Sequence, residues 1–552
     1  MADQLLTGHV DTFCSNQAPP PELWPERKYS GVPELAYPDW MNCGGELLDA
    51  AVEKGFGDTT VFHFPEGTWT YEHLLVTSNK IANVLVDDFG LVPGNRVLLR
   101  GPNNPMMAAC WFAVVKAGGV VVTTMPLLRE RELRYIADKA EIRLALTDTR
   151  FAEECMGGFA THSDGSVRRE ARVVHFNSDS HQSLEPRMRD ASGAFQNCRT
   201  AADDTAIIAF TSGTTGEGKG TMHSHRDIMA ITDCFPRYVL KPTGTDIFCG
   251  SPPLAFTYAL GGLLLFPMRC GASSLLLEHA SPPQLMEAIE RFRPTICFTA
   301  PTAYRAMHPL IGTHDISSLR QCVSAGETLP KSIFDAWLRA TGLSIIDGIG
   351  ATEMLHIFIS AAGTDIRPGS TGRVVPGYEA MVVDENGAEV PRATVGQLAV
   401  KGPTGCRYLD NVEQQRTYVR NGWNFTGDSY VMDADGYFWY QARADDMIIS
   451  GGYNIAGPEI ENVLLEHAAV AECAVVGEPD EKRGRIVKAF IVLRTGYAGG
   501  KLLTEELQNF VKARIAPYKY PRAIEYTKAL PRTSTGKVQR YRLRESGHEH
   551  HG

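Results

Sequence analysis

Short apolar runs alternate with amphipathic stretches of helical length over most of the chain, from about residue 49 to residue 410. The clearest runs are NRVLLRGP (95–102), GGVVVTT (118–124), IRLALTD (142–148), AIIAFTS (206–212), GASSLLLE (271–278) and PTICFTA (294–300). Continuous apolar strands separated by helices are typical of parallel sheets that are covered on both faces. We therefore expect an α/β fold with a large N-terminal domain of stacked parallel sheets and helices.

The pattern changes after about residue 374, where turn residues and short apolar runs replace the helical stretches. Glu385-Asn386-Gly387 lies between two apolar runs and predicts a hairpin within a small β-rich part. From about residue 443, a strand, a glycine turn, a helix with proline near its start and an amphipathic helix over 505–513 predict a small α+β C-terminal domain. We place the two domains at 1–443 and 444–552. The polar stretch 163–193 is expected to be a surface insertion or a disordered loop.

Composition narrows the class of protein. The 552 residues carry a formal net charge of −10, which argues against a general nucleic-acid-binding or anionic-membrane surface. The 12 cysteines include no C-x-x-C pair, so a metal cluster or disulfide framework is not expected and a reducing cytoplasm is the predicted location. The N-terminus lacks the pattern of a signal peptide, and no run reaches the roughly 18 apolar residues of a membrane span.

The most informative segment is the glycine-rich loop 210–220 (FTSGTTGEGKG), which follows an apolar strand and precedes a helix. Such a loop presents backbone N–H groups and hydroxyls to a polyphosphate, with Lys219 as a counter-charge. Residues 213–219 also fit the P-loop pattern G-x-x-x-x-G-K, but Gly220 stands where that motif needs a hydroxyl to hold magnesium. A plain flexible loop is the third interpretation, although it does not require hydroxyls packed so densely between glycines.

TSGTTGEGKG resembles the phosphate loop of the adenylate-forming superfamily, which includes acyl-CoA synthetases, peptide-synthetase adenylation domains and luciferases. Gly218 replaces the proline that is usual there. Other segments resemble the family's motifs in the same order, and the resemblance covers about residues 45 to 540: SAGE (324–327), DGIGATE (347–353), FTGD (425–428), RADD (443–446) and PRTSTGK (531–537).

The resemblance implies a role for each matching position. It implies that ATP is bound by Thr211, Ser212, Gly213, Thr214, Thr215, Gly216, Lys219, Gly326, Glu327, Asp347, Gly348, Ile349, Thr352, Asp428, Arg443 and Lys537. It assigns Mg²⁺ to Glu353, and catalysis to Lys537, Thr352, Glu353 and the interdomain hinge Asp445. In the family a mobile C-terminal domain then swings, and the face of Gly451, Gly452 and Tyr453 replaces the Lys537 loop and admits the thiol of coenzyme A.

These residue types suit the implied chemistry. A carboxylate attacks the α-phosphate of ATP and expels pyrophosphate, so two anions must be held together while charge develops on phosphorus oxygens. Lys537 supplies a cation that bridges both anions. Glu353 offers the hard oxygen ligand that magnesium prefers, and Asp428 accepts both hydroxyls of a ribose diol.

The resemblance to the family implies an acyl pocket lined by Phe256, Tyr258, Ala259, Ala325, Gly326, Gly350 and His356. Aromatic and very small side chains leave a flat slot that suits a planar ring better than a long chain. The segments PPLAFTYALGG and DGIGATEMLHIF resemble the benzoate-CoA ligase branch, in particular its 2-aminobenzoate (anthranilate) members. We therefore predict 2-aminobenzoate as the first-choice acid and benzoate as the second. His356 either contacts the acid or is a core histidine.

The leading hypothesis is an AMP-forming aryl-CoA ligase that uses ATP, Mg²⁺ and coenzyme A. One alternative is a freestanding adenylation enzyme that loads an aryl acid onto a carrier protein. A second alternative is a nucleotide-binding regulator on the same fold, which is disfavoured because Lys537, Glu353 and Thr352 are all present.

Overall fold

Two large sheets form the N-terminal part of the computed structural model, which describes residues 6–211, 218–443, 446–450, 453–480, 484–515, 519–533 and 536–545. The six-stranded sheet has the order β6-β5-β3-β4-β7-β8, in which only β8 runs antiparallel to its neighbour. Its strands are β3 (Arg96–Arg100), β4 (Val120–Thr124), β5 (Leu144–Asp148), β6 (Arg172–Phe176), β7 (Thr205–Phe210) and β8 (Gly220–Ser224).

The nine-stranded sheet has the order β15-β14-β13-β12-β11-β9-β10-β1-β2 and is parallel from β13 to β1. Its strands are β1 (Thr60–Phe64), β2 (Gly67–Thr70), β9 (Ile247–Gly250), β10 (Ser273–Leu275), β11 (Ile296–Thr299), β12 (Gln321–Ser324), β13 (Ile345–Gly350), β14 (Ile357–Ser360) and β15 (Arg373–Val374). All six apolar runs of the sequence form strands of these two sheets.

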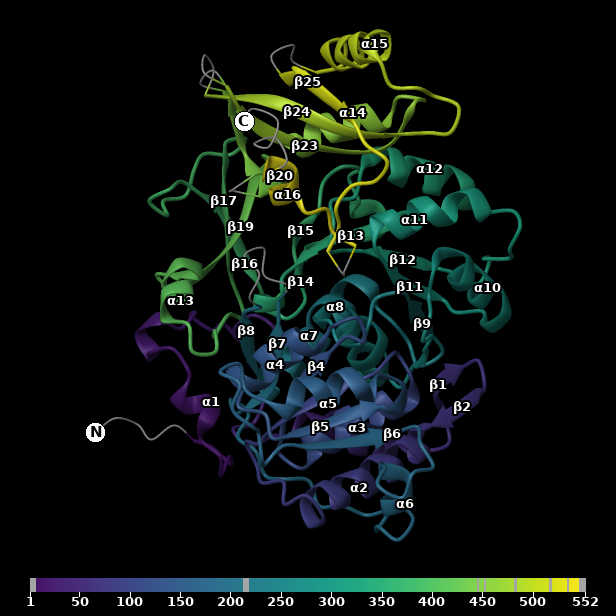
Figure 1. The fold of residues 1–552 in the computed structure, drawn as a ribbon, viewed down its shortest axis with the longest axis vertical. Helices are drawn as coiled ribbons and strands as arrows, with labels where there is room; N and C mark the ends of the chain where they lie inside the picture. The colour runs from purple at the N-terminus through teal and green to yellow at the C-terminus, as the bar shows by residue number, and fades with distance from the viewer. Residues whose placement is uncertain are drawn as a thin grey trace.

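Helices pack on the faces of both sheets (Figure 1). Side-chain caps set where several of them begin: Thr70 accepts from the His73 N–H at the start of α2, and Ser224 and Asp227 form a capping box on α7. The helices are α1 (Phe13–Asn16), α2 (Tyr71–Asp87), α3 (Pro105–Lys116), α4 (Glu130–Lys139), α5 (Ala152–Ala160), α6 (Leu184–Met188), α7 (His225–Asp233), α8 (Thr257–Ala259), α9 (Phe266–Arg269), α10 (Pro282–Phe292), α11 (Pro301–Met307), α12 (Lys331–Thr341) and α13 (Val412–Tyr418).

A β-rich part follows, with strands β16 (Glu379–Val383), β17 (Val395–Lys401), β18 (Val419–Arg420), β19 (Trp423–Met432) and β20 (Phe438–Arg443). The turn predicted at 385–387 joins β16 to the chain that leads into β17, and Gly387 has a φ of +84° there. A left-handed backbone of this kind favours glycine.

The C-terminal part is α+β, and in Figure 1 it lies across the top of the N-terminal sheets. It contains β21 (Ile448–Ser450), β22 (Tyr453–Ile455), α14 (Gly457–Leu465), β23 (Val470–Asp480), β24 (Gly484–Leu493), α15 (Lys501–Lys512), β25 (Ala523–Tyr526) and α16 (Arg540–Glu545). A separate apolar core that includes Ile460, Val475 and Leu507 stabilises it. The predicted fold class is therefore confirmed.

One expectation was wrong. The stretch 163–193 is neither a simple insertion nor a loop, because it contains β6, which pairs in parallel with β5 at the edge of the six-stranded sheet, and α6. An edge strand with one open side needs fewer apolar residues than a central one, and RVVHF is therefore a weak signal. No helix in the described ranges is long and apolar enough to cross a lipid bilayer.

Candidate active site

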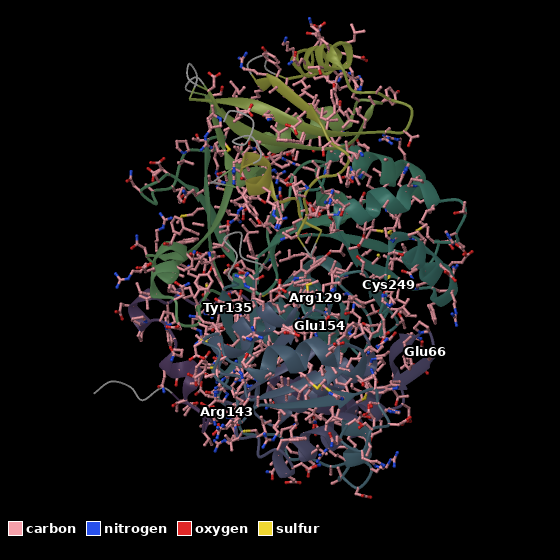
Figure 2. All side chains as sticks on the ribbon, viewed as in Figure 1. Glu66, Arg129, Tyr135, Arg143, Glu154 and Cys249 are labelled. Atoms are coloured by element: carbon pink, nitrogen blue, oxygen red, sulfur yellow. The ribbon has the colours of Figure 1, made fainter. Side chains whose placement is uncertain are left out.

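A backbone hydrogen bond joins the two ends of the glycine-rich loop. The N–H of Thr211, which follows β7, donates to the Lys219 carbonyl at 2.9 Å, and the chain then enters β8. Tyr135 of α4, labelled in Figure 2, donates to the Gly218 carbonyl at 2.9 Å. The predicted phosphate-binding residues Ser212, Gly213, Thr214, Thr215 and Gly216 lie outside the described residues.

The segment DGIGATE places its residues at the end of β13 and in the short helical turn Thr352–Met354 that follows. The Glu353 carboxylate accepts a hydrogen bond at 2.6 Å from the phenol of Tyr408. Asp347 has one buried oxygen, Oδ1, without a partner among the described residues, and burial raises the pKa of this carboxyl well above its usual range. An unpaired acceptor of this kind suits a donor on a bound ligand.

Asp428 and Arg443 face each other across paired strands β19 and β20. Arg443 donates to Asp428 Oδ1 at 3.1 Å and to the Thr426 carbonyl at 3.2 Å. Burial raises the pKa of Asp428, while the Arg443 guanidinium and the Lys537 ammonium oppose that rise. The two residues that resemblance assigns to the ribose and the nucleotide therefore form one charged pair.

Lys537 reaches this same region from the other end of the chain. In Figure 1 the yellow segment that leads into α16 passes down beside β13. The Lys537 side chain keeps exposed surface, but the protein around its ammonium removes hydration and lowers its pKa. The carboxylates of Asp428, Glu327 and Glu353 pull that pKa back up. The structure thus gathers four predicted site residues from four segments of the sequence.

The turn that carries Lys537 is fixed locally and is tied to the N-terminal part. The Thr533 N–H donates to the Lys537 carbonyl at 2.7 Å, and Arg532 donates to the Gly536 carbonyl at 2.6 Å. Arg532 also donates to Glu472 Oε2 at 2.8 Å, and Arg305 of α11 donates to Glu472 Oε1 at 3.1 Å. Glu472 therefore links α11 to the Lys537 turn.

The predicted acyl-pocket residues meet around α8. Tyr258 donates its hydroxyl to the Val323 carbonyl at 3.2 Å, so its ring is held as a wall. A Cβ on Gly350 would lie 2.9 Å from the His356 backbone, which only glycine avoids. The Phe256 backbone caps α8, Ala259 and Ala325 are buried, and Gly326 has open space beside its α-carbon.

His356 lies inside an aromatic cluster, with its ring centroid 4.5 Å from that of Phe266 and 5.7 Å from that of Tyr258. Burial lowers its pKa to about 3, so the imidazole is neutral at pH 7. Its Nε2 lies 3.2 Å from the Tyr258 carbonyl and must carry the proton to donate, which leaves Nδ1 as an acceptor. Nδ1 is buried and has no partner in the described part of the chain.

Comparison with known proteins identifies the family. Residues 48–408 match the model of the AMP-binding enzyme family, and residues 459–537 match the AMP-binding enzyme C-terminal domain. The chain belongs to the AMP-binding enzyme family. It is 35% identical to a benzoate–CoA ligase of Thauera aromatica over 93% of this chain and 97% of that protein. It is 32% identical to a 3-hydroxybenzoate–CoA ligase of Aromatoleum sp. (strain CIB), over 92% and 97% of the two chains.

Solved structures agree. The anthranilate CoA ligase AuaEII in complex with anthranoyl-AMP superposes with a TM-score of 0.88 at 33% identity, over 94% of this chain and 99% of that one. A benzoate CoA ligase from Burkholderia xenovorans LB400 superposes with a TM-score of 0.83 at 31% identity, over 91% of this chain and 100% of that one. The resemblance to the benzoate and 2-aminobenzoate branch is thereby confirmed. This AMP-binding enzyme is an AMP-forming acid–CoA ligase, with ATP and coenzyme A as substrates.

The structure of this AMP-binding enzyme does not describe several residues for which the sequence predicts a role. Asp445, predicted to be the hinge, and Gly451 and Gly452, predicted to contact coenzyme A, lie outside the described residues. Of Tyr453 only the backbone, at the start of β22, is described. Conversely, sequence reasoning missed Tyr408 and His223, which contact the turn 352–354. His223 was visible only as part of HSHRD, and no spacing in the sequence links it to that turn.

We expect Arg305→Gln to slow the adenylation half-reaction roughly three- to fivefold, because a partly exposed ion pair contributes up to about 1 kcal/mol. The substitution removes the ion pair between Glu472 and α11, so the Lys537 turn, which Arg532 joins to Glu472, is held less firmly. Thioester formation from pre-made acyl adenylate should not slow. Pyrophosphate exchange and thioester assays measure the two halves. Arg291→Gln, an exposed change on α10, is the control; equal slowing of both halves by Arg305→Gln would contradict the role of Glu472.

Proposed function

We propose that this AMP-binding enzyme is an aryl-CoA ligase that adenylates a one-ring aromatic acid, with 2-aminobenzoate as the first choice and benzoate as the second. The observation that carries the proposal is the predicted acyl region: the His356 ring packs against the rings of Tyr258 and Phe266, and Gly350 beside it has no room for a side chain. Rigid rings and glycine suit a flat substrate. The named substrates of the benzoate, 3-hydroxybenzoate and anthranilate ligases support the same class.

The proposed first step joins acid and nucleotide. A carboxylate oxygen of the acid forms a bond to the α-phosphorus of ATP, and the bond to the pyrophosphate oxygen breaks. Lys537 places its ammonium between the two anions, and Thr352 bonds the α-phosphate. Asp428 accepts the ribose hydroxyls and Arg443 holds Asp428 in place. These groups need no rearrangement as charge develops, which is how preorganised donors lower a barrier.

The proposed second step transfers the acyl group. The thiolate of coenzyme A attacks the acyl carbon, the bond to the phosphate oxygen breaks, and AMP leaves. We propose that the C-terminal domain (444–552) turns about Asp445 so that Gly451, Gly452 and Tyr453 replace the Lys537 loop. Two consecutive glycines allow close backbone approach by a pantetheine arm.

We also propose that Glu353 holds Mg²⁺. The described residues contain no cluster of three or more His, Cys, Asp or Glu side chains that could hold an ion alone. Magnesium is commonly bound by one or two carboxylates together with substrate phosphates, and the single Glu353 carboxylate fits that pattern. When bound, the ion would neutralise phosphate charge.

We expect kcat/KM for 2-aminobenzoate to exceed that for benzoate by roughly tenfold, because a buried acceptor left unpaired costs about 1–3 kcal/mol. His356 Nδ1 is such an acceptor, and an ortho amino group that reached it would satisfy it. Octanoate should be a far weaker substrate than either. Pyrophosphate release and acyl-CoA formation are measured with all three acids. A higher kcat/KM for octanoate than for the two aromatic acids would contradict the aromatic assignment.

A matched pair of variants tests the acceptor. His356→Gln keeps a donor near the Nε2 position and loses the Nδ1 acceptor. The ratio of kcat/KM for 2-aminobenzoate to that for benzoate should therefore fall toward one. His356→Asn keeps an acceptor near Nδ1 and should retain part of the preference. Replacing free coenzyme A with a carrier protein decides between the ligase and a carrier-loading enzyme.

A further inference from the structure

Side chains from elsewhere in the chain hold each of the three residues of the turn 352–354. The Nε2 of His223, on β8, lies 2.7 Å from the Thr352 carbonyl. Thr404 donates its hydroxyl to the Met354 carbonyl at 2.9 Å. Tyr408 donates to Glu353 Oε1 at 2.6 Å. Two of these bonds fix the backbone, whereas the third fixes a side chain to which a function is proposed.

The environment of Tyr408 fixes the direction of that bond. Tyr408 is 1% exposed and stacks edge-on against Tyr418, with ring centroids 5.8 Å apart. A phenol hydroxyl has a proton to donate, whereas an ionised carboxylate can only accept one, so Tyr408 is the donor in this bond. A hydrogen bond to an ionised group is stronger than one between neutral groups.

The backbone beside Glu353 also depends on its surroundings. Leu355 is buried and has a φ of +70°, which an L side chain rarely adopts. Such a conformation costs about 1–3 kcal/mol and persists only where neighbouring contacts determine it. The bonds from His223 and Thr404 hold the backbone of the turn that precedes Leu355, and the bond from Tyr408 holds the Glu353 side chain.

We propose that Tyr408 is a positioning residue for Glu353. Its hydroxyl occupies Oε1 and leaves Oε2, to which none of the described residues donates, as the oxygen turned to the nucleotide-bound magnesium. The inference rests on the proposed metal role of Glu353. Tyr408 also lines a pocket of about 430 Å³ together with Lys219 and Tyr135, which lie beside the end of the glycine-rich loop.

Tyr408→Phe tests the proposal because it keeps the ring and removes only the hydroxyl. The variant should need about tenfold more Mg²⁺, the usual loss when a group that orients a metal ligand is removed. The readout is the rise in melting temperature on adding ATP at increasing Mg²⁺, without the acid, so that no turnover is required. Apparent KM for Mg²⁺ in the adenylation assay is a second readout.

Tyr418→Phe is the matched control. The Tyr418 hydroxyl is buried and has no hydrogen-bond partner among the described residues, so its removal should not raise the Mg²⁺ requirement. Melting temperatures without ligand are recorded first for each variant. If Tyr408→Phe titrates like the wild type, or if Tyr418→Phe shifts the titration equally, the proposal is overturned.

Glu353→Asp supplies a second route that does not require Tyr408→Phe to be stable alone. The shorter side chain keeps its charge but withdraws from the Tyr408 hydroxyl, and the Mg²⁺ requirement should rise. Adding Tyr408→Phe to Glu353→Asp should change the Mg²⁺ requirement less than twofold further, because the effects of substitutions at two coupled residues do not add. Full additivity contradicts the proposal. Failure of the metal role of Glu353 gives a different result: Glu353→Asp then has the same Mg²⁺ requirement as the wild type.

Discussion

Lys537→Ala should slow the adenylation half-reaction roughly 100- to 1,000-fold, the usual loss when one preorganised group that stabilises developing charge is removed. Lys537 is a cation in the field of Asp428, Glu327 and Glu353. Thioester formation from pre-made acyl adenylate should be spared, because the lysine is assigned only to the first step. ATP–pyrophosphate exchange and acyl-CoA formation from synthetic adenylate measure the two halves.

The pH profile gives an independent check. Loss of hydration lowers the pKa of Lys537, so the wild-type adenylation rate should fall as pH rises through that lowered value and the ammonium becomes neutral. Lys537→Arg, whose charge persists, should remove this alkaline fall. Lys528→Ala is the control, an exposed lysine outside the loop. Equal loss of both half-reactions in Lys537→Ala contradicts the assignment.

Asp428→Ala should lower kcat/KM for ATP by roughly 100-fold, since hydrogen bonds to a charged group are worth about 1.5–3 kcal/mol and two ribose hydroxyls are at stake. The variant also removes the ion pair between Arg443 and Asp428 Oδ1. Asp428→Asn keeps one acceptor and should lose less. Saturation with ATP, followed by pyrophosphate release, separates weaker binding from slower chemistry.

Asp435→Asn, at the exposed turn between β19 and β20, is the matched control because its partner is Arg367, away from the nucleotide residues. 2′-Deoxy-ATP, which lacks one of the two ribose hydroxyls, adds a test on the substrate. The ratio of kcat/KM between the wild type and Asp428→Ala should be smaller with 2′-deoxy-ATP than with ATP. An unchanged KM for ATP in Asp428→Ala would show that the ribose assignment is wrong.

Much of the fold could be predicted because the central strands are continuous apolar runs: β3, β4, β5 and β7 each follow directly from one. β6 could not, since an edge strand tolerates polar residues. Family motifs allowed Asp428, Glu353 and Lys537 to be named before any geometry was known, and their roles stay predictions. Tyr408 and His223 were missed because the chain before α13 and β8 meet the turn 352–354 only through tertiary packing, which leaves no local pattern.

The placement of Lys537 has a consequence for the direction of the reaction. A group that stabilises a transition state speeds the forward and reverse steps equally. Lys537 belongs to the C-terminal part, whereas Asp428, Glu327 and Glu353 belong to the N-terminal part. A turn of the C-terminal domain would therefore withdraw the catalyst of pyrophosphorolysis together with that of adenylation. The acyl adenylate would then stay committed to the thiol even while pyrophosphate accumulates.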